Sequence, residues 1–450
     1  MISELKIYSS PYNVFVPLLS GQIVLINTLY GALDIIDKEH QEKMLKPHLL
    51  DSETREYLLS RGYLTTEMKQ KESLVRLEKL CAQRYKKWII PHYYVFLITY
   101  NCNLACTYCY EREIRKESFD YYSKKMTKKQ VDLAFKGIEA LEENTKVQKI
   151  PIRLYGGECL LPSNYEIINY ILEVGNDNNF IFDVDTNGTH LASYVDLLAK
   201  YNTQCIFVTL NGVEKVHNST RVFKGGQGSF DRVIEGIEAA YEHNIPVIAS
   251  INANIDSLTH LPELFEYAQT KEWGATVKFR LNLIRNLGCN KSTTSPGQFF
   301  SAFTALVRDQ KIPYSFFLNK VPSFIRSAIE EKKLRHSFWS CPCNGKILIF
   351  DSHGYLYSCY GEVGASKRAI GRFDPGMDIW EDKFTPWKNR TVLNIPECRN
   401  CNLAFICGAG CGHVALTTTN KLEKPDCEYT KAVVKHVLPL YLANSLKGLT

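Results

Sequence analysis

Residues 101–110 read Asn-Cys-Asn-Leu-Ala-Cys-Thr-Tyr-Cys-Tyr and bring three cysteines, Cys102, Cys106 and Cys109, into one short loop. Three thiolates at this spacing can each bind one iron of a four-iron cluster and leave the fourth iron open. A structural zinc site is the alternative, but zinc prefers four ligands and no fourth lies nearby in the sequence. The stretch therefore predicts a 4Fe–4S cluster with one open iron.

Outward from this loop, apolar runs typical of strands alternate with amphipathic helical stretches. The expected strands are residues 93–98, 150–154, 180–184, 205–210, 246–251 and 277–283. The expected helices are residues 128–142, 165–174, 193–201, 230–243, 261–270 and 296–307. This alternation predicts right-handed βαβ units and a parallel sheet. Six units are fewer than the eight of a closed barrel, so we expect an α/β fold with a partial (β/α)6 barrel of the TIM type.

The cysteine motif, its place after the first strand and the segments after the later strands resemble the radical S-adenosylmethionine (radical SAM) superfamily. Tyr155-Gly156-Gly157-Glu158 follows the second strand and is similar to the family's GGE motif. The resemblance implies that S-adenosylmethionine binds the open iron. It also implies that one electron splits this cofactor into methionine and a 5′-deoxyadenosyl radical, which removes a hydrogen atom from the substrate.

The resemblance also assigns cofactor-binding residues. Tyr108 would pack beside the cofactor, Gly156 and Gly157 would allow close backbone approach, and Glu158 would accept from the cofactor's ammonium group. The remaining candidates after strands three and four are Asp185, Thr186, Asn187 and Arg221. The first three would reach the ribose, with an ordinary turn and helix cap as the alternative. Arg221 would bind the cofactor's carboxylate or, alternatively, a surface acid.

Two positions depart from the family pattern. Asn211 stands where the family commonly has aspartate, which puts an acidic role there in doubt, and His217 follows it in the same stretch. Cys159 replaces a frequent proline after the GGE motif. We interpret Cys159 as a packing substitute, with a redox role as the alternative.

The C-terminal cysteines resemble the seven-cysteine SPASM pattern, with an eighth cysteine added. The resemblance implies two auxiliary 4Fe–4S clusters. The inner one would bind Cys341, Cys343, Cys359 and Cys411. The outer one would bind Cys398, Cys401, Cys407 and Cys427. Cys341 and Cys343 are unusually close for two ligands of one cluster, and if only one binds, an open iron could take a substrate thiolate. Zinc ribbons are the alternative for the Cys398-x2-Cys401 pair.

The chain divides into three expected regions: residues 1–90, 91–310 and 311–450. The first contains strand, hairpin and helix signals that resemble a winged-helix domain, followed by a polar linker helix over 67–87. It would bind the leader of a precursor peptide at an exposed strand edge, with a plain structural role as the alternative. The last is loop-rich, so metal coordination would supply part of its folding energy.

Composition limits the class of protein. The chain has 450 residues, a net charge of +6 and 15 cysteines. The charge is too weak for a typical nucleic-acid binder, and no apolar run is long enough to span a membrane. With no signal-peptide pattern, we expect a cytoplasmic protein whose cysteines bind metal rather than pair. We interpret the solitary Cys81, Cys159, Cys205 and Cys289 as small buried hydrophobes.

These expectations favour a peptide maturase that installs a thioether, carbon–carbon or ether crosslink and takes electrons from a flavodoxin or ferredoxin. Two auxiliary clusters suit a net oxidation, whereas an epimerase would need a hydrogen-atom donor. A sulfatase-maturating enzyme is the alternative, but the resemblance would require aspartate after Cys359, where Tyr360 stands. A non-catalytic iron–sulfur electron carrier would have no use for the cofactor-binding segments.

Overall fold

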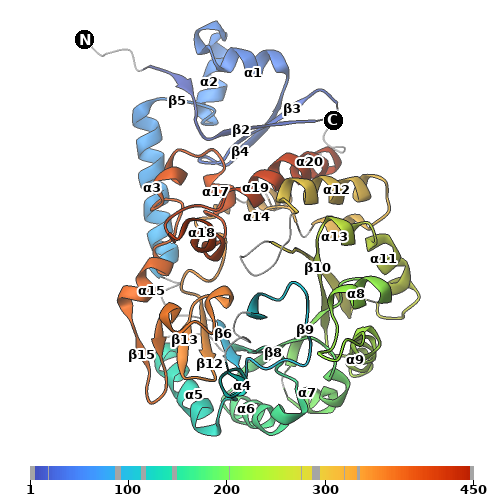
Figure 1. Ribbon diagram of the computed structural model, residues 1–450. Helices are drawn as coiled ribbons and strands as arrows, with labels where there is room; N and C mark the ends of the chain where they lie inside the picture. Colours follow the sequence, from blue (N-terminus) through green and yellow to red (C-terminus); the bar gives the residue numbers. More distant parts are fainter. Residues whose placement is uncertain are drawn as a thin grey trace.

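The central element is a ten-stranded sheet with the strand order β11-β10-β9-β8-β7-β6-β12-β13-β14-β15 (Figure 1). The computed structural model describes residues 6–18, 20–86, 93–112, 118–143, 149–201, 203–274, 276–285, 294–318, 320–331 and 335–445. The six predicted strands are confirmed as β6 (Tyr93–Leu97), β7 (Pro151–Tyr155), β8 (Ile181–Thr186), β9 (Thr203–Thr209), β10 (Val247–Ala253) and β11 (Val277–Leu283). All six are mutually parallel, as the βαβ pattern predicts.

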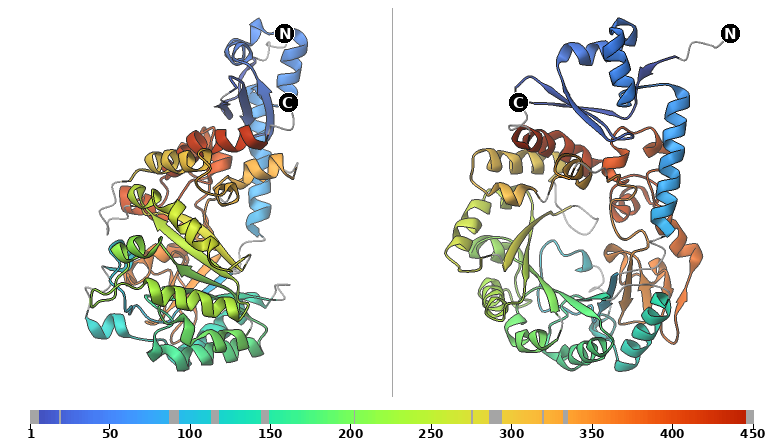
Figure 2. Two further views of the ribbon diagram at one scale, coloured as in Figure 1. Left: turned by 90° about the vertical axis from the view of Figure 1, so that its right-hand side faces the viewer. Right: turned by 180° about the vertical axis from the view of Figure 1, so that it is seen from behind.

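Helices cover the outer, convex side of this curved sheet (Figure 2). They are α5 (Lys128–Glu142), α6 (Tyr165–Asp177), α7 (Val195–Lys200), α9 (Phe230–Glu242), α11 (Leu261–Gln269) and α12 (Pro296–Arg308). In α5 the side chain of Thr127 caps the first turn, and Val131, Ala134, Phe135 and Ile138 form its buried face. This spacing places one apolar stripe against the sheet, so the helices bury the strands on that side.

The barrel is open, and a strand from the C-terminal region extends it. β6 pairs in parallel with β12 (Ile347–Asp351) rather than with β11. Beyond β12 the sheet continues with the antiparallel strands β13 (Tyr355–Tyr357), β14 (Gly371–Arg372) and β15 (Asp378–Ile379). The sequence did not predict β12, because a short apolar run such as residues 347–350 gives no periodicity that separates a strand from a buried helix.

The N-terminal region contains a three-stranded antiparallel sheet between two apolar layers. The sheet is formed by β2 (Asn13–Pro17), β3 (Ile23–Asn27) and β4 (Ala32–Ile36). Val14, Val16 and Ile26 pack into the main core, while Leu25 packs with Met44 on the other face. Since successive side chains of a strand point to opposite faces, this alternation fixes the sheet between the helices and the body of the molecule.

The other N-terminal elements are a second, two-stranded sheet and three helices. A short pair joins β1 (Tyr8–Ser9) to β5 (Leu64–Thr65). The helices are α1 (Lys38–Met44), α2 (Ser52–Ser60) and the long α3 (Glu67–Lys86). Asp51 caps α2 by accepting from the backbone N–H of Thr54. α3 runs down the side of the molecule toward the barrel (Figure 1).

Short helices and loops make up the C-terminal region beside β12–β15. They are α13 (Tyr314–Leu318), α14 (Ser323–Ile329), α15 (Glu381–Lys388), α16 (Pro396–Arg399), α17 (Ala404–Cys407), α18 (Gly412–Thr419), α19 (Glu428–Ala432), the π-helical turn η8 (Val433–Val437) and α20 (Leu438–Ser445). Tyr12 and Leu29 of the N-terminal region share an apolar cluster with Phe405 and Cys398 of this region. Among the described residues, no helix combines the length and the apolar character needed to cross a membrane.

Candidate cluster and cofactor site

The cysteine loop follows β6 and is fixed by its backbone to the last residue of α8 (Glu214–Thr220) and to the segment after it. The N–H of Ala105 donates to the carbonyl of Val222 at 2.8 Å, and the N–H of Thr107 donates to that of Thr220 at 3.0 Å. The Cys102 sulfur accepts from the backbone N–H of Leu104 at 3.4 Å. The loop therefore has a defined course that its own backbone bonds maintain.

A cavity of about 310 Å³ opens in front of the three thiols. Of the eleven residues predicted to hold the cluster and the cofactor, the structure places all except Glu158 in its lining. They are Cys102, Cys106, Cys109, Tyr108, Gly156, Gly157, Asp185, Thr186, Asn187 and Arg221. Across the described parts of the chain, no three His, Cys, Asp or Glu side chains converge on a single ion. Three thiols spread around one cavity suit a multi-iron cluster, whose ligands each bind a different iron.

The glycines of the GGE turn allow the turn to pack directly on the cysteine loop. A Cβ atom at Gly157 would lie 2.4 Å from the carbonyl oxygen of Tyr100 and 2.6 Å from that of Asn101. The Gly157 N–H donates to the carbonyl of Thr99 at 2.9 Å, and the N–H of Glu158 donates to that of Asn101 at 2.8 Å. Any side chain at position 157 would push the two loops apart.

The Glu158 carboxylate forms its hydrogen bonds with other groups of the chain. Its carboxylate accepts from the Thr186 hydroxyl at 2.6 Å and from the backbone N–H groups of Asn187 at 2.6 Å and Leu160 at 2.8 Å. Burial raises the pKa of Glu158, and these three hydrogen bonds act against that shift. The carboxylate thus ties the loop after β7 to the loop after β8, and its contact with a cofactor ammonium group stays a prediction.

The loop after β8 is also bonded to the cysteine loop. The Asn187 amide nitrogen donates to Asn103 at 2.8 Å and to the Cys102 sulfur at 3.7 Å. Asp185 lines the cavity beside Arg153, with 3.6 Å between the carboxylate and the guanidinium. Burial raises the pKa of Asp185, while Arg153 acts in the opposite direction. The Cys159 thiol is fully buried and donates to the carbonyl of Asp185, as a packing role requires.

Arg221 and Tyr108 form the opposite wall of the cavity. The Arg221 guanidinium donates to the Tyr108 hydroxyl at 2.9 Å, and the Asn211 amide donates to the same hydroxyl at 2.9 Å. Arg221 is 5% exposed, and its Nε is buried without a hydrogen-bond partner. Among the described residues, no carboxylate forms an ion pair with Arg221, and its role toward the cofactor's carboxylate stays a prediction. An unpaired N–H of a buried guanidinium is a suitable donor for an anionic ligand.

His217 lies behind this wall. It is fully buried, with its Nε2 3.0 Å from the Ser229 hydroxyl. Burial, assisted by the charge of Arg221, lowers the pKa of His217 to about 3. It is therefore a neutral, structural histidine at physiological pH.

The C-terminal cysteines form two groups in space. Cys343 interacts by hydrogen bonds with both Cys341 and Cys359, and Cys411 interacts electrostatically with Cys341 and Cys359. The hydrogen bond with Cys343 lowers the pKa of Cys341 to about 7.

The second group is formed by the other four predicted ligands. Burial raises the pKa of Cys398 to about 12, and the thiols of Cys407, Cys427 and Cys401 add to the effect. Cys427 likewise interacts with Cys401. The two groups contain the same residues as the predicted inner and outer ligand sets, so these donor sets fit two iron–sulfur clusters.

The prediction that the solitary cysteines are buried holds for only some of them. Cys81 and Cys159 are buried, whereas Cys205 is only half-buried. Cys289 lies outside the described residues.

Comparison with known proteins agrees with this geometry. The model of the radical SAM superfamily matches residues 96–265, which span β6 to α11 and include the cysteine loop and the GGE turn. The chain carries a radical SAM domain. The sequence-based prediction of this domain, and of an α/β fold built around it, is confirmed.

Three similar proteins place the radical SAM domain in a wider context. A cysteine-type anaerobic sulfatase-maturating enzyme of Clostridium novyi (strain NT) is 24% identical over 69% of this chain and 85% of its own length. A solved structure of native anSMEcpe with bound AdoMet and a peptide has a TM-score of 0.61 at 17% identity, over 78% of this chain and 98% of that one. The solved structure of Streptococcus suis SuiB bound to precursor peptide SuiA has a TM-score of 0.50 at 15% identity. The match covers 93% of this chain and 98% of that one.

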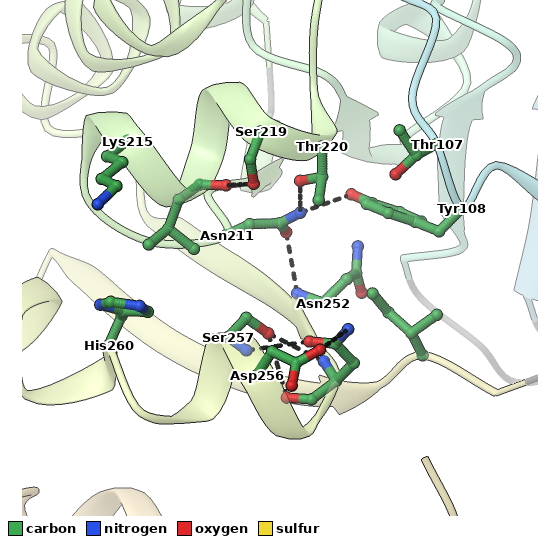
Figure 3. A pocket seen from close by; sticks show the side chains of 13 residues that line it. Thr107, Tyr108, Asn211, Lys215, Ser219, Thr220, Asn252, Asp256, Ser257 and His260 are labelled. Carbon is green, nitrogen blue, oxygen red and sulfur yellow. Dashed lines mark hydrogen bonds between the residues drawn. The ribbon is translucent and has the colours of Figure 1, made fainter. Parts of the chain in front are cut away.

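Beside the cofactor cavity of the radical SAM domain lies a larger polar cavity of about 500 Å³ (Figure 3). The two cavities share Tyr108, Asn252 and Ile284. Lys215 and His260 face each other across this second cavity, from α8 and the start of α11 (Figure 3). The sequence did not predict this cavity, because the helices that line it carry no motif of their own.

The sequence also missed residues on the floor of the radical SAM cavity. Tyr155 donates to the Glu111 carboxylate at 3.2 Å, and both residues line the cavity. Arg285, which follows β11, also lines it and forms a two-pronged ion pair with Asp426 at 2.7 and 2.9 Å. Asp426 accepts from the backbone N–H of Cys411, so this pair links the radical SAM cavity to the C-terminal cysteines.

Proposed function

We propose that the chain is a radical SAM peptide maturase that binds a ribosomally made precursor peptide and installs a thioether, carbon–carbon or ether crosslink. The observation that carries the proposal is the convergence of ten predicted cluster and cofactor residues on one cavity. The two C-terminal cysteine groups, one of them linked to that cavity through Asp426 and Arg285, support a net oxidation. A flavodoxin or ferredoxin would supply electrons, and the reaction would take place in the cytoplasm.

The chain's own residues would prepare this reaction. A cluster on Cys102, Cys106 and Cys109, together with S-adenosylmethionine, would supply hydrogen abstraction from an unactivated carbon. The unpaired Nε of Arg221 would hold the cofactor's carboxylate. The backbone of the Gly156–Gly157 turn would line the amino-acid end, and Asp185 would lie toward the ribose.

The N-terminal region would hold the leader of the precursor. In the described part of this region, β2 and β4 each pair on one side only, so each leaves an edge that an extended peptide can complete. The likeness to SuiB, a protein solved with its precursor peptide, leaves 7% of this chain uncovered, which is about 31 residues. Because the region has about 90 residues, the likeness to SuiB includes most of it. We therefore expect the leader on this sheet.

A sulfatase-maturating reaction is the second candidate, because a relative and a structural neighbour of that kind are similar over most of the chain. The residue after Cys359 counts against it. Tyr360 stands there, and its ring packs edge-on against Tyr155 with 5.0 Å between ring centres. A phenol in this place cannot act as the carboxylate base that a reaction of this kind would use.

The test is anaerobic. Reconstituted protein is incubated with S-adenosylmethionine and dithionite, 5′-deoxyadenosine is followed by chromatography, and iron is counted per chain. We expect deoxyadenosine and about twelve irons for three four-iron clusters, with deoxyadenosine lost in the Cys102→Ala/Cys106→Ala/Cys109→Ala variant. Its absence from the parent protein would overturn the catalytic proposal, and about four irons would overturn the auxiliary clusters.

Substrate class is tested with two peptides. One is a candidate precursor with its leader, and the other is a short sulfatase-type peptide containing cysteine. Loss of two hydrogen atoms from the precursor, dependent on the leader, is expected. Formylglycine in the short peptide would favour the second candidate.

A further inference from the structure

Asn344 is a buried amide without partners, next to two predicted cluster ligands. Asn344 is 8% exposed, and neither its amide nitrogen nor its amide oxygen has a hydrogen-bond partner. With Cys341, Cys343 and Arg390 it lines a small cavity of about 20 Å³. Buried amides are nearly always paired, because an unmade hydrogen bond leaves the cost of desolvation uncompensated. Something that these residues hold is therefore expected to pair with the amide.

Two polar side chains that line this cavity, those of Arg390 and Ser340, already have other partners. Arg390 donates to the carbonyls of Leu422, Gly410, Ala409 and Lys424. The Ser340 hydroxyl, which also lines the cavity, donates to the carbonyl of Gly410. Neither Cys341 nor Cys343 forms a hydrogen bond with the Asn344 amide, so we expect its partner to be a group that their sulfur atoms bind.

The cysteine group beside Asn344 fits an iron–sulfur cluster. Cys343 forms hydrogen bonds with both Cys341 and Cys359, and Cys411 interacts electrostatically with Cys341 and Cys359. Four soft thiolates with an N–H donor beside them are the surroundings in which hydrogen bonds to sulfur tune a cluster's reduction potential.

We propose that Asn344 donates a hydrogen bond to a sulfur of the inner auxiliary cluster and thereby raises its reduction potential. The inference rests on the proposed auxiliary clusters. The reduced cluster carries one more negative charge than the oxidised cluster, so a donor at its sulfur stabilises the reduced form more. Asn344 is a positioning residue of the electron acceptor and touches neither substrate nor S-adenosylmethionine.

The rival occupant is a single buried water. A cavity of about 20 Å³ is large enough for one water molecule. A water would satisfy the amide without touching the cluster, and the potential would then not depend on Asn344. The two occupants are distinguished by the potential alone.

The experiment uses the full chain carrying Cys102→Ala/Cys106→Ala/Cys109→Ala, so that only auxiliary clusters remain. Reduction is followed by electron paramagnetic resonance at controlled potentials. Asn344→Leu keeps the side-chain size and removes the donor. We expect one of the two cluster midpoints to fall, by 59 mV for a tenfold change in the equilibrium between oxidised and reduced forms, while the other stays unchanged.

Two further variants keep the proposal open to disproof. Asn344→Asp removes the donor, adds negative charge and should lower the same midpoint further. Asn394→Leu removes an exposed amide that donates only to a backbone carbonyl, and should leave both midpoints unchanged. Unaltered midpoints in both Asn344 variants, at about eight irons per chain, would overturn the inference and leave the proposed function standing. No auxiliary iron in the parent protein would overturn the inference together with the proposed auxiliary clusters.

Discussion

The two cysteine regions of this protein are built in different ways. The loop of Cys102, Cys106 and Cys109 follows a buried strand and is bonded by its backbone to the segment after α8 and to the GGE turn. The C-terminal cysteines lie on short helices and loops whose course depends on one buried arginine, Arg390, and on close glycine contacts. A barrel preorganises the first region, whereas we expect the second to depend on a bound cluster for stability.

The largest effect should come from removing ligands of the outer group. Cys398→Ser/Cys401→Ser should cost about 5 kcal/mol or more in the stability of the C-terminal region, because metal binding there supplies folding energy. The Cys102→Ala/Cys106→Ala/Cys109→Ala variant should change stability by about 1 kcal/mol or less, because backbone bonds hold that loop. Thermal unfolding of both anaerobic proteins checks this. Equal losses would remove the distinction between the two regions.

The second largest loss of stability should come from substituting Arg390. Arg390→Met removes hydrogen bonds to four carbonyls that join the loops near residues 409 and 423. Leaving these buried carbonyls unpaired should cost about 4 kcal/mol and lower the iron content. Urea unfolding and iron analysis give the result. A stable variant with full iron would show that the ligand alone organises these loops.

Asp351 joins the two regions and should make stability depend on pH. Its carboxylate accepts from the Tyr100 hydroxyl, just before the cysteine loop, at 2.9 Å. Burial raises the pKa of Asp351 from 3.8 to about 6. The folded state thus binds this proton more tightly than the unfolded state does. The contribution of Asp351 to the free energy of unfolding is therefore fully present below pH 4 and is lost as the pH rises through about 6.

The expected loss across this window is about 3 kcal/mol, from a shift of roughly two pKa units. Asp351→Asn keeps an acceptor for the backbone N–H groups of His353 and Tyr355 and cannot titrate. The difference in unfolding free energy between the two proteins, measured in urea at pH 4 and pH 7, isolates the effect. A pH-independent difference would contradict the prediction.

The smallest effect should come from the rim of the outer cysteine group. Arg399 forms an ion pair with Glu78 of α3 at 2.7 Å, with side chains 57% and 43% exposed. Arg399→Ala should cost about 0.5 kcal/mol, because exposed ion pairs are screened by water and salt. Equilibrium unfolding at low and high salt measures it. A loss similar to that of Arg390→Met would mean that α3 itself supports the cysteine loops.

Much of the barrel and of its site could be predicted from local sequence. Each predicted strand from residue 93 to 283 is present, and ten of eleven cluster and cofactor residues line one cavity. Strand periodicity and cysteine spacing are local properties, so a single sequence carries them. The contact of Glu158 with a cofactor stays a prediction, and its partners on the loop after β8 could not be predicted because no sequence pattern reveals them.

The sequence by itself determined the alternation of strands and helices from residue 93 to 283 and the cysteine motif, and its resemblance to the SPASM pattern predicted both C-terminal ligand sets. Only the tertiary structure decided that β12 closes against β6, that Arg285 joins the cavity to Asp426, and that Asn344 is buried beside Cys343. The physical reason is the range of the forces. Periodicity and capping act over a few residues, whereas burial and hydrogen-bond partners are set by segments that lie far apart in the chain.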